Sequence, residues 1–353
     1  MAHRNSHNPD RPTKGTLCLM LLLFAAISAF PLAQERYTAN RPITTPPKPV
    51  TENWLESPQK QTESLRWETD YRYAQRKAED LARYLLVYLY ADSEQNLPEA
   101  SADFPVVSAC LEFDTMVLED DSVRAGLNKY VLLKMPMDAK VTDANGETTS
   151  IYSLPGFEHM LELPGLVVID FSSRNMPFFG EVVGILPFMH GESPTAKQTE
   201  VFLNLPPGTL TQRTLTYAVR IHPDQPLSSN GEPLPIVVWE TTAHALYQAE
   251  RGIITHQNYG VRSARIREEL GGGGSPAEIC AMSQSGLSLF EGAMSCMRLW
   301  RHSSRHWSIA RKEHTYYGYD MALGKSGAWH GVGFFMGLPQ PENEQPSLPA
   351  ALE

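Results

Sequence analysis

Residues 67–188 alternate between helical and strand patterns, and this order constrains the fold more than any other feature of the chain. A first helical stripe, with apolar residues at spacings of four, three, four and three, consists of Trp67, Tyr71, Ala74, Ala78 and Leu81. The apolar run Tyr84 to Tyr90 then predicts a buried strand. The first two thirds of residues 106–138 are helical in pattern, and a second strand is expected from Tyr130 to about Met135. This helix–strand–helix–strand order favours parallel pairing of the strands through a right-handed crossover.

Two further strands are expected next to each other. The apolar segments Gly165 to Phe171 and Met176 to Phe188 flank the polar turn "SSRN", which predicts an antiparallel hairpin. Parallel strands followed by a hairpin describe a small three-layer domain of the α/β class.

Residues 63–205 resemble the thioredoxin-like fold. The segment "CLEFDTMVLEDDSVRAGLNKYVLLKM" looks like the part that follows the redox motif in secreted, divergent members, and Pro164 stands where the family carries a cis-proline. In place of the family's C-x-x-C the chain has "VSAC", with Val107 at the first position and Cys110 at the second. Since dithiol exchange needs the missing attacking thiolate, the resemblance implies a redox-inactive domain in which Cys110 is a small buried hydrophobe.

The second half of the chain begins near Pro207 and opens with a helical pattern. A long helix is predicted to end near His256, and its apolar face consists of Trp239, Ala243, Leu246, Ala249 and Ile253. After the glycine run 271–274, Ser275 and Glu278 have the spacing of a capping box, which predicts that another helix starts at Ser275.

A further helix and a hairpin complete this half. The helix is expected to align Leu289, Ala293, Met297 and Trp300, and it leads into the stretch "RHSSRHW". The glycine-rich sequence that follows predicts two strands around the turn "GKSG".

Residues 208–336, taken in this order, resemble the bacterial branch of the CAP superfamily, the cysteine-rich secretory, antigen 5 and pathogenesis-related-like domains. The matching positions are His256 at the end of the long helix and Glu278, Ile279 and Ala281 at the family's Glu-Asn-Ile-Ala type motif. The stretch "WRHSSRHW" stands in place of Trp-x-x-Ser-Pro-Gly-His. The resemblance implies an α-β-α sandwich after the thioredoxin-like domain.

In that family a central cleft lined by histidines and acids can hold a divalent metal. The resemblance therefore implies His256, Glu278 and His306 as metal ligands, with Zn²⁺ suited to imidazole and carboxylate donors. Ile279 replaces the family's asparagine, and Ser303 stands where eukaryotic members often have a second acid.

Each of the three residues also has a structural alternative. Glu278 fits the capping box with Ser275, and His256 near a helix C-terminus would be stabilised by the helix dipole. His306 could pack against Trp307, and His302 is expected on the solvated surface.

The N-terminus predicts export. Basic residues precede the apolar run Leu17 to Phe30, so residues 1–33 are expected to be a signal peptide or an uncleaved signal anchor. Residues 34–62 form a Pro-rich linker by composition, and residues 337–353 are expected to be a disordered tail. The protein would then be secreted or periplasmic, with the anchor as a possible membrane tether.

Charge and cysteine content narrow the function. A formal net charge of -10 and the absence of a basic cluster exclude a general nucleic-acid binder. Beyond Cys18 in the signal, the chain has Cys110, Cys280 and Cys296, which are expected to be buried free thiols, although Cys280 and Cys296 are close enough in sequence to pair.

These observations predict an exported two-domain protein that binds a small-molecule, lipid or protein ligand rather than turning one over. One alternative is a metal-dependent hydrolase that uses the His256, Glu278 and His306 cleft, with Glu278 as general base. Another is an envelope thiol protein that acts through Cys110 alone.

Overall fold

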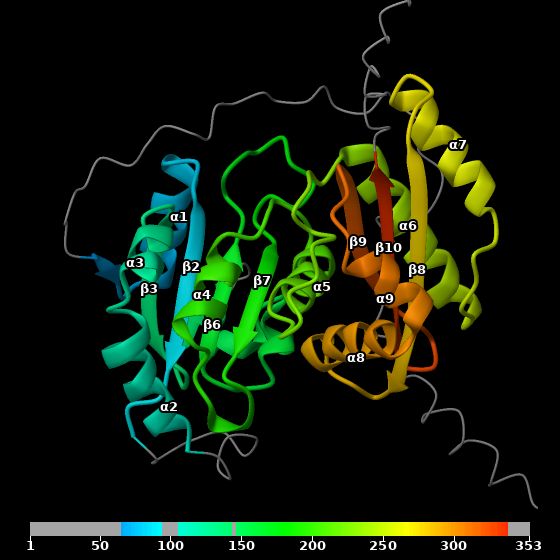
Figure 1. Cartoon of the computed structure of the whole chain (residues 1–353). Coiled ribbons are helices and arrows are strands. Elements are labelled where there is room, and N and C mark those ends of the chain that lie inside the picture. Colours follow the sequence, from blue (N-terminus) through cyan, green and yellow to red (C-terminus); the bar gives the residue numbers. More distant parts are fainter. Residues whose placement is uncertain (1–64, 94–104, 143–145, 338–353) are drawn as a thin grey trace, which may run out of the picture. The chain divides into compact units, whose positions relative to one another are not determined.

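The computed structural model describes residues 65–93, 105–142 and 146–337 (Figure 1). The predicted signal, the predicted linker and residues 338–353 of the predicted tail lie outside the described residues. Residues 63 and 64, at the start of the predicted thioredoxin-like domain, also lie outside them. No helix in the described part of the chain has the length and apolar character needed to span a bilayer. Helices and strands are mixed along the chain, which confirms the α/β class.

The first sheet is built around the two strands that the sequence predicts first. β2 (Tyr84–Tyr90) and β3 (Tyr130–Pro136) pair in parallel, and β1 (Trp67–Glu68) pairs in parallel with the far side of β3. β6 (Gly165–Ile169) and β7 (Val182–Pro187) continue the sheet on the other side of β2 and pair antiparallel as expected. The second strand begins at Val182 and not at Met176, so the connection is longer than the predicted turn "SSRN". The strand order is therefore β1-β3-β2-β6-β7.

The helices between these strands follow the predicted order with two local corrections. α1 (Tyr71–Asp80) starts after Asp70, whose carboxylate accepts the backbone N–H of Tyr73 at 2.6 Å. Trp67 lies in β1 and Leu81 is exposed, so neither belongs to the buried helical stripe.

Several short elements complete this part of the chain. The segment between β2 and β3 consists of α2 (Val106–Glu112), the π turn η3 (Phe113–Val117) and α3 (Asp121–Leu127). A two-stranded ribbon of β4 (Lys140–Thr142) and β5 (Thr148–Ser150) follows β3. The 3-10 turns η4 (Ile151–Ser153) and η5 (Phe157–Met160) come between this ribbon and β6. The 3-10 turn η6 (Met189–Gly191) and the helix α4 (Ala196–Leu203) come after β7. The described residues contain no cis peptide bond, so the expectation of a cis bond at Pro164 is wrong.

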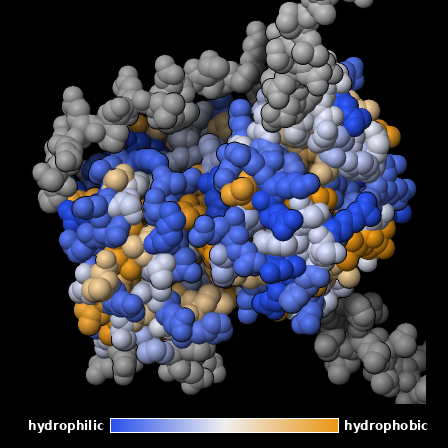
Figure 2. Space-filling view, viewed as in Figure 1, coloured by the Kyte–Doolittle hydropathy of each residue, from blue (hydrophilic) through white to orange (hydrophobic). Residues whose placement is uncertain are grey.

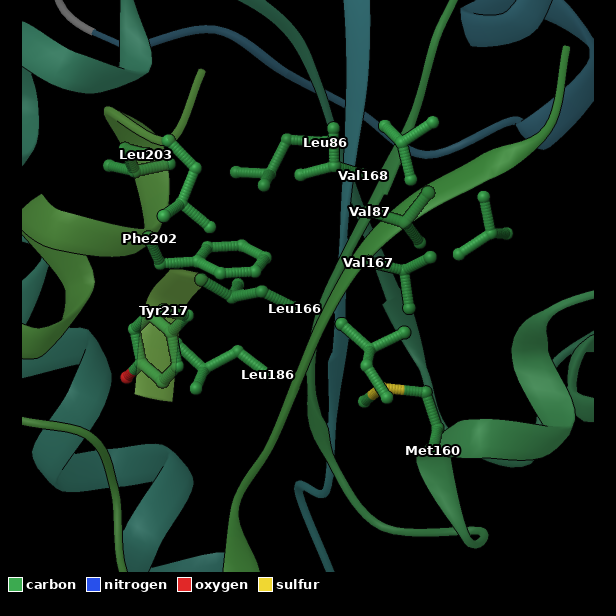
Figure 3. Close-up of a cluster of buried hydrophobic side chains, with 14 of the residues drawn as sticks. Leu86, Val87, Met160, Leu166, Val167, Val168, Leu186, Phe202, Leu203 and Tyr217 are labelled. Carbon is green, nitrogen blue, oxygen red and sulfur yellow. The ribbon is translucent and has the colours of Figure 1, made fainter. Parts of the chain in front are cut away.

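Apolar side chains cover both faces of this sheet (Figure 3). Phe202 of α4 and Tyr217 of α5 (Leu210–Arg220) lie on one side of the strands with Leu166, and Met160 lies on the other side. The rings of Phe202 and Tyr217 meet edge to face, with centroids 6.0 Å apart. α5 belongs to the second predicted half, so that half contributes directly to the core around the first sheet.

The second sheet lies between two helices. β8 (Ser275–Ser285), β10 (Ala328–Gly337) and β9 (Tyr316–Leu323) pair antiparallel in the order β8-β10-β9, and the last two form the predicted hairpin. Successive residues of a strand face opposite sides of its sheet. Val332 of β10 packs with Ala245 of α6 (Pro235–Arg251). A Cβ on the adjacent Gly331 would lie 2.9 Å from Cys296 of α8 (Leu289–His302), so α6 and α8 cover opposite faces.

Three predictions in this half are wrong. Residues 275–285 form β8 rather than the start of a helix, and the unpredicted helix in this region is α7 (Tyr259–Glu269). α6 ends at Arg251 because Gly252 adopts a left-handed conformation with φ of 64°, which places His256 in the following loop. The predicted apolar face of α6 is also wrong, since Trp239 and Ala243 are exposed and Ile253 lies beyond the end of the helix.

Candidate functional site

The buried face of α6 carries polar residues. Glu240, His244 and Gln248 follow each other at intervals of four, so they lie on one face of the helix, and all three are buried. Buried polar groups need partners because their desolvation is costly. This face therefore identifies a polar centre inside the second half.

β8 supplies the acid at this centre. Glu278 is buried, and its Oε2 accepts two hydrogen bonds from Arg262 of α7, from Nε at 3.1 Å and from Nη2 at 2.5 Å. Its Oε1 lies 2.7 Å from Nδ1 of His256. Both carboxylate oxygens are thus engaged, and the alternative of a capping box between Glu278 and Ser275 is wrong because no helix starts there.

The loop between α6 and α7 holds His256 against Glu278. Nε2 of His244 lies 2.7 Å from the carbonyl oxygen of Thr255, and Oε1 of Gln248 accepts the Thr255 N–H at 3.2 Å. Nη1 of Arg262 donates to the carbonyl oxygen of Gln257 at 2.6 Å. The residues on both sides of His256 are therefore fixed by buried side chains, while the His256 side chain itself is 49% exposed.

His306 approaches His256 from another element. α8 ends at His302, and α9 (Ser304–Ala310) begins after Ser303, whose side chain caps the N–H of His306. His302 and His306 therefore do not share one continuous helix. The rings of His256 and His306 have centroids 6.2 Å apart, whereas His302 is exposed, as the sequence predicts. The structure thus brings together all three residues predicted from the sequence, His256, Glu278 and His306.

Electrostatics keep Glu278 ionised and His306 neutral. Burial alone would raise the pKa of Glu278, but the hydrogen bond from His256 and the positive charge of Arg262 outweigh it and lower the pKa. Burial, and then the neighbouring His256, lower the pKa of His306. An acid with a lowered pKa and both oxygens engaged is a poor general base, which argues against the hydrolase alternative.

The hydrogen-bond partners assign the protons on two histidines. A carboxylate and a carbonyl oxygen only accept, so Nδ1 of His256 and Nε2 of His244 must carry hydrogen. In the neutral imidazole with this tautomer, the lone pair of His256 is on Nε2, on the side of the ring away from Glu278. His256 can use this nitrogen to bind a metal, whereas His244 cannot use its Nε2.

His244 and Cys280 also belong to this centre, although the sequence does not predict them there. His244, Glu278 and Cys280 offer ligand atoms within 4.8 Å of one another, which is compact enough to suggest a metal group. Nε2 of His244 and both oxygens of Glu278 are occupied by protein partners, however, and burial raises the pKa of the Cys280 thiol. The sequence does contain a signal for these two residues. His244 is one of the polar residues at intervals of four on α6, and Cys280 follows Glu278 by two in β8, so each spacing indicates a polar side of its element.

The three cysteines of the described region are as the sequence predicts. Cys110, Cys280 and Cys296 are free and buried, so Cys280 and Cys296 form no disulfide. Burial also raises the pKa of the Cys110 thiol. This environment argues against the alternative in which Cys110 acts as an exposed thiol.

Comparison of the chain with protein-family models, curated proteins and solved structures found no match. The face of the molecule shown in Figure 2 is mostly hydrophilic, and its hydrophobic residues form small separate patches.

Proposed function

We propose that this chain is a binding protein in which a redox-inactive thioredoxin-like module precedes a CAP-like module, and that the CAP-like module holds a Zn²⁺ ion between His256 and His306. Glu278 acts in this proposal as the carboxylate that orients His256. Export to the periplasm or beyond, by way of residues 1–33, is part of the same proposal.

Two features of the fold support the choice of modules. The strand order β1-β3-β2-β6-β7, with three parallel strands and an antiparallel hairpin, is the order expected of a thioredoxin-like sheet with its N-terminal strand. The β8-β10-β9 sheet with α6 on one face and α8 on the other has the layers of an α-β-α sandwich.

The observation that carries the metal proposal is the hydrogen bond between Nδ1 of His256 and Glu278. Histidines that bind metals almost always donate their other ring N–H to a carboxylate or carbonyl, which fixes the ring and the tautomer. Two imidazoles bound to one Zn²⁺ place their ring centroids roughly 5 to 6 Å apart, given Zn–N distances of about 2 Å. The 6.2 Å between His256 and His306 fits this arrangement after a small movement of the half-exposed His256 ring.

A Zn²⁺ ion with two imidazole ligands retains coordination positions for water or for a donor atom of a ligand. In this proposal the chain's own residues perform the other tasks. Arg262 holds Glu278, Glu278 holds His256, and the capped start of α9 presents His306. The proposed partner is a small-molecule, lipid or protein ligand that offers such a donor atom.

The test is a calorimetric titration of the chelator-treated full chain with Zn²⁺, together with metal analysis of the protein as purified. We expect one Zn²⁺ ion per chain. His306→Gln should weaken binding at least about tenfold because it removes one of two imidazole ligands.

The matched control is His302→Gln, four residues away and exposed, which should bind Zn²⁺ as the unmodified chain does. Failure of the full chain to bind Zn²⁺ would overturn the proposal. An equal loss in the His302 and His306 variants would also overturn it, since binding would then come from surface histidines in general.

A further inference from the structure

The stretch around His302 borders a second feature, a surface hollow of about 370 Å³. The hollow lies at the end of α8 and along α9, and it is lined by Arg301, His302, Ser304, Trp307, Ser308 and Arg311. Its volume falls at the lower end of the range for small-molecule sites, roughly 300 to 1,000 Å³.

Positive charge dominates this lining. Arg301 and Arg311 contribute two guanidinium groups, and Asp224, which pairs with Nε of Arg301, contributes one negative charge. The two guanidinium groups thus outweigh the one carboxylate. Among the described residues no ion pair is found for Arg311, so its charge is available to a ligand.

One of the two guanidinium groups is already oriented. Arg301 is paired with Asp224 on one side, and its Cζ lies 5.0 Å from the centre of the Trp307 ring. A guanidinium fixed by stacking and by an ion pair loses less entropy when it binds an anion. Ser304 adds a hydroxyl group that can donate a hydrogen bond to the same anion, whereas the hydroxyl of Ser308 donates to the carbonyl oxygen of Arg305 at 2.8 Å.

The hollow lies on a different side of α9 from the proposed metal site. Ser304, Ser308 and Arg311 recur at spacings of four and three, which places them on one face. His306 comes two residues after Ser304, so it points about 200° around the helix from it. The two sites therefore use opposite sides of one short helix.

We propose that this hollow binds the tetrahedral oxyanion of a small phosphate or sulfate monoester, and that it does so independently of the metal site. The guanidinium groups of Arg301 and Arg311 pair with the anion, because their planar N–H groups match the geometry of such oxygens. The Trp307 ring contacts the organic group, which gives the monoester more contacts than the inorganic ion has.

The experiment is calorimetry on the chelator-treated full chain at low ionic strength, with phenyl phosphate, phenyl sulfate, inorganic phosphate and phenol as separate probes. We expect at least one phenyl ester to bind more tightly than inorganic phosphate, and phenol not to bind. The two esters distinguish a phosphate site from a sulfate site. Arg311→Gln should weaken binding at least about tenfold, as expected for loss of a charged hydrogen bond.

Two variants serve as controls. Arg124→Gln removes an arginine from α3, outside the hollow, and should leave binding unchanged. His306→Gln should also leave it unchanged, so loss of Zn²⁺ binding and loss of ester binding remain separable results. Absence of binding by both esters, or equal weakening by Arg124→Gln and Arg311→Gln, would overturn the inference. The exposed position of Arg311 makes unfolding of its variant unexpected, and a melting curve checks this.

Discussion

Replacement of Arg262 by Leu should destabilise the protein strongly. The side chains of Arg262 and Glu278 are 6% and 1% exposed, so the change leaves a buried carboxylate without its cation. It also removes the two N–H donors to Oε2 and the bond from Nη1 to the Gln257 carbonyl. Breaking a buried ion pair by removal of one partner costs about 3 to 5 kcal/mol. We expect the free energy of unfolding, measured by urea denaturation, to fall by that amount.

A surface pair gives the matched comparison. Arg124 bonds Glu119 at 2.9 Å, but Glu119 is 65% exposed, so Arg124→Leu should cost no more than about 1 kcal/mol. Adding Glu278→Gln to Arg262→Leu should recover part of the loss, because no uncompensated charge then remains. The reasoning is refuted if Arg262→Leu costs as little as Arg124→Leu, since Glu278 would then not depend on its buried partner.

Three further predictions concern other parts of the structure. Gly292→Ala places a Cβ 2.3 Å from Cδ1 of Trp329 and should lower the unfolding free energy by about 1 to 3 kcal/mol. Gly260→Ala, in open space on α7, should raise the unfolding free energy by up to about 1 kcal/mol. Equal effects of the two changes in denaturation would contradict the packing of Gly292 against Trp329. Cys110 should label slowly with a thiol reagent in the native chain, and labelling as fast as in the unfolded chain would contradict its burial. Burial lowers the pKa of His330 from 6.5, so the unfolded chain binds its proton at a higher pH than the native protein does, and stability should fall as pH drops below 6.5. His330→Leu should flatten this fall by up to about 1.4 kcal/mol per pH unit, and an unchanged slope in denaturation between pH 7 and pH 5 would count against this.

The sequence predicts those elements whose buried residues are apolar. Tyr84–Tyr90 forms a strand with the predicted bounds, and the residues expected on the inner face of α8, Leu289, Ala293, Met297 and Trp300, are all buried. In these elements the apolar side chains alone mark the buried side, so periodicity is a sufficient guide.

The same reasoning fails where the buried side is polar. On α6 it selects Trp239 and Ala243, which are exposed, because the residues that face the sheet include His244 and Gln248. In β8 Glu278 and Cys280 alternate with Ile279 and Ala281, but the spacing of Ser275 and Glu278 favours a helix prediction instead. The spacing of Ser275 and Glu278 matches a capping box by coincidence, as the acid has a cation and an imidazole as its partners instead.

The sequence predicts three members of the candidate site, but not their roles or their other partners. His256, Glu278 and His306 come together as the resemblance implies. Arg262 could not be assigned to Glu278 from the sequence, because the helix that carries it has only a weak apolar pattern and the pairing depends on where α7 lies against β8. Arg262 contacts Glu278 and Glu278 contacts His256, and these residues lie on α7, on β8 and in the loop after α6. The two contacts therefore form only when all three segments are in place.

The direction in which the side chains of α9 point depends on a single residue, Ser303. It ends one helix and caps the next, so the rotation of α9 about its own axis is set at this position. One residue inserted directly after Ser303, with the cap kept in place, would turn every later side chain of α9 by about 100° about the helix axis. His306 on one side and Ser308 and Arg311 on the other would then be misdirected together. A change of length at this junction therefore alters both surfaces at once.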